Sequence, residues 1–119
     1  MSKTPTPKRG EVWDVNFDPS QGEEIRKRRP AVVISHENIG RLRLRIVVPV
    51  TDWKPVYSGD GWFVRLSPSK ANGLSKESGA DAFQVKSVSE KRFVKKRGAL
   101  QPDQVDDVAA AIAICVGVP

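Results

Sequence analysis

The sequence predicts a mainly β domain with one C-terminal helix. Five apolar runs follow one another at short spacing, and clusters of Gly, Pro, Asn and Ser separate them, which indicates short strands with little helix between them. After Pro102 the apolar residues change to helical spacing. A chain of 119 residues rarely supports two hydrophobic cores. We therefore expect one domain, built on an antiparallel sheet or barrel.

The expected strands are defined by apolar or alternating residues. The first two contain the runs EVWDVNF and AVVIS, the third contains VVPV, and turn-forming residues flank all of them. A later stretch, rich in Lys and Arg, is typical of the last arm of a hairpin and ends at Gly98. The five strands are expected over residues 11–17, 31–35, 42–50, 62–66 and 82–88.

Arginine and aliphatic residues alternate strictly between Arg41 and Ile46. Successive side chains of a strand point to opposite faces, so Leu42, Leu44 and Ile46 are expected to share one face and to join the core. The arginines would form a basic ridge on the other face. That ridge is either a solvated strand face or a surface for RNA or an acidic partner.

The last segment is expected to form the closing helix. Pro102 suits the first helical turn, and Asp103, Asp106 and Asp107 carry the charge that complements the helix N-terminus. Apolar residues repeat at helical spacing on one side of this segment. They are Val105, Val108, Ala109, Ile112 and Val116.

The charge of the chain favours a polyanionic partner. Lys and Arg number 20 against 14 Asp and Glu, which gives a formal net charge of +6. RNA, DNA or an acidic protein segment would each suit such a surface. The sequence has no residue spacing typical of a metal site, and we expect neither a metal nor a cofactor.

We expect a cytoplasmic protein without a membrane anchor. No apolar run approaches the roughly 18 residues of a membrane span, and the first residues lack the hydrophobic stretch of a secretion signal. The one cysteine, Cys115, lies in an apolar run and is expected to be a core residue, which suits a reducing compartment. Residues 1–8, with prolines among Ser, Thr and Lys, are expected to form a disordered tail.

An Arg-Pro step between the first two strands is the clearest candidate for chemistry. Arg29 offers a planar guanidinium that can bind two phosphate oxygens at once, and Pro30 restricts the backbone of Arg29 to an extended conformation. The step ends an acidic and then basic loop. The structural alternative is an arginine paired with Glu23, Glu24 or Asp18.

Several segments together resemble the MazF/PemK/Kid toxins, which are sequence-specific endoribonucleases of bacterial toxin-antitoxin modules. The segments are RGEVWDVNFDPSQGEE, RRPAVVIS at Arg28–Ser35, VVPVT at Val47–Thr51, DAFQVKSVSEKR at Asp81–Arg92, and a closing G-A-L-x-P before the helix. The resemblance covers residues 9–119. It implies a homodimeric SH3-like β-barrel that cuts single-stranded RNA without a metal and is inhibited by a cognate acidic antitoxin.

The resemblance also implies which residues act in catalysis. Arg29 and Thr51 match the catalytic arginine before the proline and the catalytic threonine that ends a later strand. Glu24 aligns with a loop glutamate of the family. It is expected either to accept a proton or orient the RNA, or to be a plain salt-bridge partner. Arginine keeps its proton and is a poor general base, so we expect Arg29 to stabilise charge while the base stays unassigned.

The RNA-binding residues are expected in the basic loop, around Thr51 and near residue 85. Trp53 and Tyr57 could stack on unpaired bases. The stretch DWKPVYSGDG after Thr51 departs from the shorter turn common in the family, which affects the predicted base preference. The full set of expected RNA-binding residues is Arg26, Lys27, Arg28, Trp53, Lys54, Tyr57, Gln84 and Lys86.

Two other functions remain open from the sequence. A related fold serves the CcdB toxins, which block DNA gyrase without an enzymatic reaction through C-terminal residues. The end of this chain, ICVGVP, lacks the aromatic residue expected for that role. The other alternative is a catalytically silent barrel that binds RNA with steep salt dependence and leaves it intact.

Overall fold

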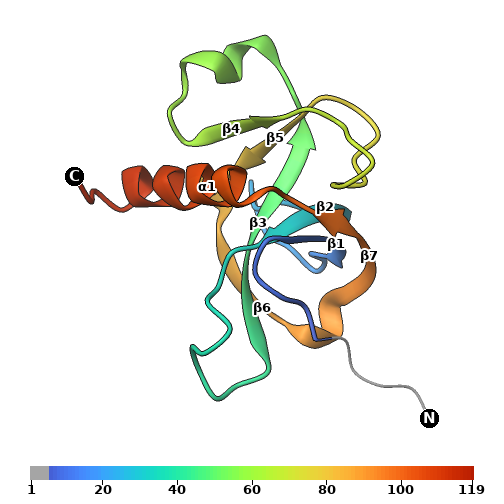
Figure 1. Cartoon of the computed structure of the whole chain (residues 1–119). Helices are drawn as coiled ribbons and strands as arrows, with labels where there is room; N and C mark the ends of the chain where they lie inside the picture. Colours follow the sequence, from blue (N-terminus) through green and yellow to red (C-terminus); the bar gives the residue numbers. More distant parts are fainter. Residues whose placement is uncertain (1–5) are drawn as a thin grey trace.

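The computed structural model describes residues 6–119, and the first five residues of the expected tail lie outside them. Seven strands and one α-helix occupy this part of the chain (Figure 1). The elements are β1 (Glu11–Asn16), β2 (Arg28–Val33), β3 (Leu44–Asp52), β4 (Phe63–Leu66), β5 (Ser78–Asp81), β6 (Lys86–Ser89), β7 (Phe93–Ala99) and α1 (Pro102–Cys115), with short 3₁₀ turns η1 (Pro55–Gly59), η2 (Ala82–Gln84) and η3 (Glu90–Arg92).

The strands form one antiparallel sheet around the long strand β3. Their order is β4-β5-β3-β2-β1-β7, and β6 pairs with the first half of β3. The expected mainly β domain with a C-terminal helix is confirmed. The expected closed barrel is corrected, because among residues 6–119 no pairing joins the outermost strands β4 and β7, and the sheet stays open.

The strand expected over residues 82–88 was placed wrongly. Residues 78–89 follow β3 along its length, but η2 interrupts them and leaves β5 and β6 as separate strands. Asp81 caps this turn by accepting a hydrogen bond from the backbone N–H of Phe83 at 3.1 Å. The sequence SGAD of β5 has little β propensity, which explains why the pattern of apolar residues did not reveal it.

Two apolar clusters fill the two faces of the inner strands. Along β2, Val32 contributes to one cluster and Val33 to the other, and both side chains are fully buried. This burial on both faces explains the continuous apolar run AVVI. The first cluster includes Val105 and Val108 of α1, which lies beside the β4–β5 hairpin (Figure 1).

Helix α1 begins and packs as the sequence predicts. The side chain of Gln104 accepts the backbone N–H of Gln101 at 3.0 Å, which closes the first turn ahead of the helix. Val105, Val108 and Ala111 are buried. Val116 lies beyond the last helical residue and is 67% exposed, so the expected apolar stripe is shorter than predicted. No helix within residues 6–119 has the length and apolar character that a membrane crossing requires.

The aliphatic residues of the alternating segment were wrongly assigned to the core. Leu42 is 72% exposed, and Leu44 and Ile46 are also solvent-exposed. On the opposite face Arg41 and Arg43 are exposed, and only Arg45 turns inward, because Glu90, only 3% exposed, holds it in an ion pair of 2.9 Å. A buried carboxylate needs such a partner.

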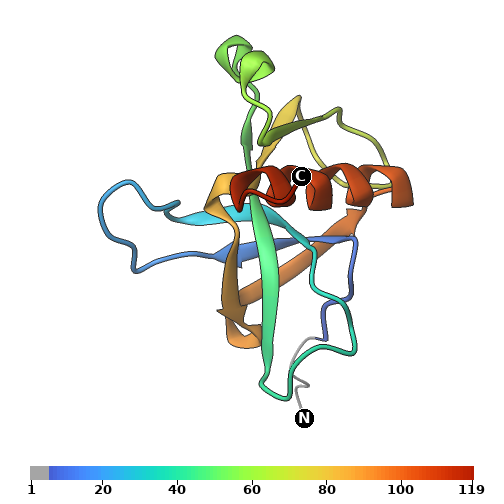
Figure 2. The ribbon, with the colours of Figure 1, turned by 90° about the vertical axis from the view of Figure 1, so that its left-hand side faces the viewer.

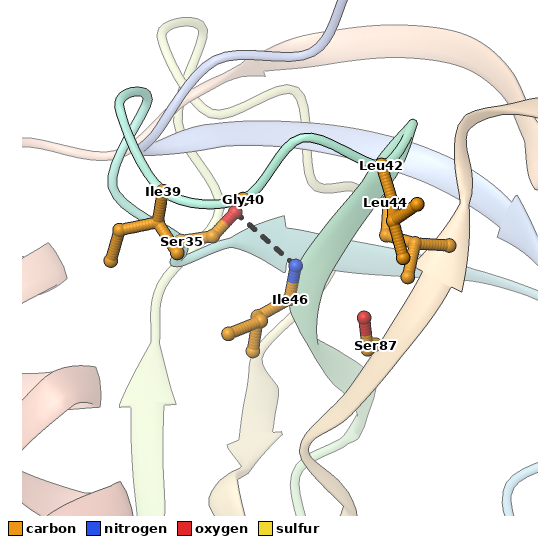
Figure 3. A pocket seen from close by; sticks show the side chains of 7 residues that line it. All are labelled: Ser35, Ile39, Gly40, Leu42, Leu44, Ile46 and Ser87. Carbon is orange, nitrogen blue, oxygen red and sulfur yellow. Dashed lines mark hydrogen bonds between the residues drawn. The ribbon is translucent and has the colours of Figure 1, made fainter.

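The aliphatic side chains of this segment line a hollow at the surface instead of a core (Figure 3). The hydroxyl of Ser35 accepts the backbone N–H of Ile46 at 3.2 Å and holds the loop against β3. The hollow is lined by Ser35, Ile39, Gly40, Leu42, Leu44, Ile46 and Ser87.

The N-terminal residues that the structure describes are held by the domain. Pro7 is buried, and its carbonyl accepts a hydrogen bond from Arg45 Nε at 2.9 Å. The backbone N–H of Lys8 donates to Glu11 Oε1 at 2.8 Å. Residues 6–8 of the expected tail therefore rest on the body of the protein.

The loop between β4 and β5 packs closely against β7. The backbone N–H of Ala99 donates to the carbonyl of Ala71 at 2.8 Å. Asn72, 3% exposed, accepts the N–H groups of Ser69 and Leu74 at 3.0 and 2.9 Å. A side chain at Gly98 would collide with the backbone of this loop.

We predict that Gly98→Ala destabilises the fold by about 1 to 3 kcal/mol, because the new methyl group must displace backbone atoms. The midpoint of urea unfolding followed by circular dichroism measures this loss. Gly59→Ala is the matched control, since its methyl group would meet no atom within 4 Å. Equal midpoints for the two variants would contradict the packing described here.

Candidate active site

The β2–β3 ladder brings the two predicted catalytic residues together. Ala31 pairs with Pro49 and Val33 with Val47 in antiparallel register. Extending this register by one more alternate step places Arg29 opposite Thr51 and on the same face. Both side chains are half-buried. The arrangement joins residues that are far apart in the sequence at the ends of two inner strands.

Two adjoining surface hollows share Arg29, Thr51 and Asp52. The loop hollow, about 230 Å³, also contains Lys54 and Tyr57 from the segment after β3. The other, the strand hollow, measures about 130 Å³ and reaches toward β5 and β7. Its remaining lining residues are Arg28, Pro30, Val50, Leu74, Ser75, Lys76, Ser78 and Arg97.

The guanidinium of Arg29 is fixed at one edge and open at the other. Its Nε donates to the carbonyl of Arg26 at 3.2 Å. Among residues 6–119 it makes no salt bridge, so the alternative pairing with Glu23, Glu24 or Asp18 is not formed. Its two terminal nitrogens form the edge that binds two phosphate oxygens side by side.

Thr51 adds a hydroxyl that is only weakly engaged within the protein. Its Oγ1 lies 3.4 Å from the carbonyl of Asp52, at the long end of the range for an O–H donor. The hydroxyl can therefore turn toward an oxygen bound between Thr51 and Arg29. A guanidinium edge beside a free hydroxyl suits a tetrahedral phosphate.

Asp52 and Lys76 were not predicted from the sequence, and both line the strand hollow. Lys76 Nζ lies 3.0 Å from Asp52 Oδ1, and both side chains are more than half exposed. Asp52 is the neighbour of Thr51, and its partner in the ladder is Ser78. Correct placement of β5 would have located Lys76 here, just before that strand.

Three of the predicted loop residues, Glu24, Arg26 and Lys27, line neither of the two hollows. Glu24 is exposed, and its Oε1 accepts the backbone N–H of Gln21 at 2.8 Å. Arg26 donates through Nη2 to the carbonyl of Gly22 at 3.0 Å. Lys27 has a positive φ of 67°, and its N–H donates to Asp18 Oδ1 at 3.1 Å. The loop, residues 17–27, projects away from the sheet (Figure 2).

Gln84 clamps this loop to η2. Its Oε1 accepts the N–H of Ile25 at 3.1 Å, and its Nε2 donates to the carbonyl of Glu23 at 3.0 Å. Both polar atoms of the Gln84 amide are therefore hydrogen-bonded within the protein. Lys86, half-buried in β6, pairs with Val47 and also lies outside the two hollows.

Of the two aromatic candidates, only Tyr57 lines a hollow beside Thr51. Its ring stacks on Phe63 with the centroids 3.8 Å apart and meets Trp53 edge-on at 5.8 Å. Trp53 packs over Gly79, where a methyl group would come within 3.1 Å of the indole, and Arg65 lies 5.2 Å from the centre of its ring. Trp53 therefore contacts Tyr57 edge-on but does not line the loop hollow.

The two hollows together form a cation-rich surface. Lys54 lines the loop hollow, and Arg28, Lys76 and Arg97 line the strand hollow. His36 lies outside both, where its Nδ1 accepts the N–H of Asn38 at 3.2 Å. Within residues 6–119 no group of His, Cys, Asp and Glu side chains gathers in a way that could hold a metal ion. The arrangement can bind a phosphodiester and stabilise added negative charge on it.

Comparison with known proteins agrees with this geometry. "Endoribonuclease MazF9" of Mycobacterium tuberculosis is 30% identical over 90% of this chain and 93% of its own length. "Endoribonuclease toxin MazF" of Escherichia coli K12 is 31% identical over 93% and 95% of the two chains. The crystal structure of MazF from Deinococcus radiodurans superposes with a TM-score of 0.77 and 26% identity, over 93% of this chain and 96% of that one.

The sequence model of the family described as "PemK-like, MazF-like toxin of type II toxin-antitoxin system" matches residues 8–116. That match spans every strand and the helix. The chain therefore belongs to the PemK-like, MazF-like family of toxins of type II toxin-antitoxin systems.

Proposed function

We propose that this protein is an endoribonuclease that cuts single-stranded RNA through attack of a 2'-hydroxyl on the adjacent phosphodiester. The observation that carries the proposal is the open edge of Arg29 beside the hydroxyl of Thr51 in a cation-lined hollow. The family membership supports the proposal, as do the names of both full-length relatives, which are endoribonucleases.

In this reaction, negative charge grows on the phosphoryl oxygens as the 2'-oxygen approaches phosphorus. Arg29 stays protonated, so it acts by electrostatic stabilisation and hydrogen bonding. Thr51 donates a hydrogen bond to the same phosphate and helps to fix its orientation. The 2'-hydroxyl gives up its proton as its oxygen forms a bond to phosphorus. The bond from phosphorus to the 5'-oxygen breaks, and this oxygen takes up a proton and leaves as a 5'-hydroxyl. The immediate product of such a step is a 2',3'-cyclic phosphate.

The partners follow from the same proposal. Single-stranded RNA is the substrate, and a cognate acidic antitoxin is the inhibitor, in keeping with the toxin-antitoxin family. We place the protein in the cytoplasm, with residues 9–119 as the toxin domain. The gyrase-blocking alternative is not favoured, because the relatives that align over the whole domain are named for cleaving RNA.

We predict that Arg29→Ala lowers the cleavage rate at least about 100-fold, because the variant lacks one preorganised charged donor. Thr51→Val should cause a smaller loss, and Thr51→Ser should retain most activity through its hydroxyl. Rates are measured on a long single-stranded RNA at saturating concentration. Arg41→Ala is the matched control, since Arg41 is exposed in another loop. Unchanged cleavage by Arg29→Ala would contradict the catalytic role of Arg29.

We predict that the wild-type protein cuts RNA in the presence of EDTA and leaves 2',3'-cyclic phosphate ends, because the attacking group belongs to the RNA. Mass spectrometry of the fragments identifies the ends. Loss of cutting in EDTA with recovery on adding Mg²⁺ would contradict the mechanism. Intact RNA that remains bound would instead favour the silent RNA-binding alternative.

We also predict a homodimer in solution, with a mass near twice 13.1 kDa. Exposed aliphatic residues such as Leu42 and Leu44 and an apolar hollow that includes Trp62 and Phe83 offer surface for pairing. Sedimentation equilibrium at micromolar concentration measures the mass. A mass of one chain across that range would count against the dimer.

A further inference from the structure

A third hollow continues the surface beyond the candidate active site. It measures about 220 Å³ and is lined by Asp14, Gly73, Lys95, Lys96 and Arg97. We call it the β7 hollow. Arg97 also lines the strand hollow, which in turn shares Arg29 and Thr51 with the loop hollow. The shared lining residues place the three hollows next to one another, in order from Tyr57 to the edge strand β7.

Positive charge dominates this surface. Two of its cations on β7 are partly neutralised, since Lys96 Nζ lies 2.9 Å from Glu11 and Arg97 Nη1 lies 3.4 Å from Asp14. Lys95 is exposed and has no salt-bridge partner among residues 6–119. Arg28, Arg29 and Lys54 in the other two hollows also have no salt-bridge partner among residues 6–119.

The wall of the β7 hollow is held in place by the backbone. The loop between β4 and β5 reaches over β7 (Figure 1), where its Ala71 carbonyl accepts the N–H of Ala99. Gly73 has a φ of +68° and lies so close to Arg97 that a methyl group would collide with its carbonyl. These contacts fix the wall of the hollow that the loop supplies.

We propose that the sugar-phosphate backbone of the RNA continues from the cut site along this surface, with Arg97 and Lys95 binding phosphates remote from the cut. The inference rests on the proposed function, because it takes single-stranded RNA as the substrate. It assigns a second RNA-binding region on β7. Phosphate contacts of this kind add affinity without reading the sequence.

The lining of the β7 hollow favours a nucleic-acid backbone over an acidic peptide. A protein partner is usually anchored by apolar or aromatic side chains in a desolvated pocket. The β7 hollow offers only charged side chains and a glycine. Evenly spaced phosphates need only cations at the surface, and single strands are bound in this way along positively charged grooves.

The test compares short and long oligonucleotides that cannot be cut. 2'-O-methyl oligoribonucleotides of about 4 and about 12 nucleotides both lie within the range of about 4 to 16 nucleotides that single-strand sites cover. Fluorescence anisotropy gives Kd for each length over a series of salt concentrations. The variants are Lys95→Gln, the double variant Lys95→Gln with Arg97→Gln, and the conservative Lys95→Arg. Lys91→Gln removes the same charge from an exposed position that lines none of the three hollows.

We expect the gain in affinity from the short to the long oligonucleotide to shrink several-fold in Lys95→Gln and further in the double variant. The slope of log Kd against log salt for the long oligonucleotide should fall by about 0.7 for each phosphate that the variant no longer binds. Lys95→Arg should retain the wild-type slope, and so should Lys91→Gln. Thermal unfolding confirms that each variant is folded.

Equal slopes for Lys95→Gln and Lys91→Gln would overturn the inference. An equal loss of affinity for both lengths would also overturn it. The same holds if replacing Lys95 changes the Kd of a fluorescent oligoglutamate peptide but not that of the oligonucleotides. Cleavage of ordinary RNA by the wild type is measured in parallel. Cutting without a role for Lys95 refutes only the β7 region, whereas length-dependent binding without cutting refutes the nuclease and leaves this region in place.

Discussion

The antiparallel register between β2 and β3 is the constraint on which the site depends. Ala31 opposite Pro49 and Val33 opposite Val47 fix that register, and these residues are buried. A slip of one residue would send every side chain of β2 to the other face. The buried valines hold the ladder, and the ladder in turn holds Arg29 opposite Thr51. Burial of the core residues therefore fixes the relative positions of Arg29 and Thr51 at the surface.

The two residues of the pair are held by different means. Pro30 limits the backbone of Arg29, and the carbonyl of Arg26 takes up the Nε donor, so the plane of the guanidinium is set by main-chain atoms. Thr51 relies on its place near the end of β3 and keeps its hydroxyl free to turn. Arg29 can thus hold the phosphate in place, while the hydroxyl of Thr51 can turn to keep its hydrogen bond as the geometry of the phosphate changes during the reaction. A lysine could not reproduce the fixed, two-pronged edge.

The sequence predicted the parts of the fold and site that depend on local pattern. Arg29 was proposed as a site residue from the Arg-Pro step before an apolar run together with the family resemblance, and α1 was predicted from its spacing and its first turn. The faces at Leu42 and Leu44 could not be assigned, because alternation separates two faces without saying which one is inside. That choice depends on Glu90, which is remote in sequence and holds Arg45 inward.

Strand β5 shows a second limit of local pattern. Its residues are small, and its stability comes from neighbours: Trp53 and Phe63 pack where Gly79 leaves room, and β3 supplies the ladder. Missing β5 meant missing Lys76, which β5 carries to the strand hollow beside Thr51. Residues that approach a site through tertiary packing have no signal in the sequence around them. Lys76 and Arg97 were therefore recognised only from the structure, whereas Arg28, Arg29 and Lys54 were predicted from the sequence.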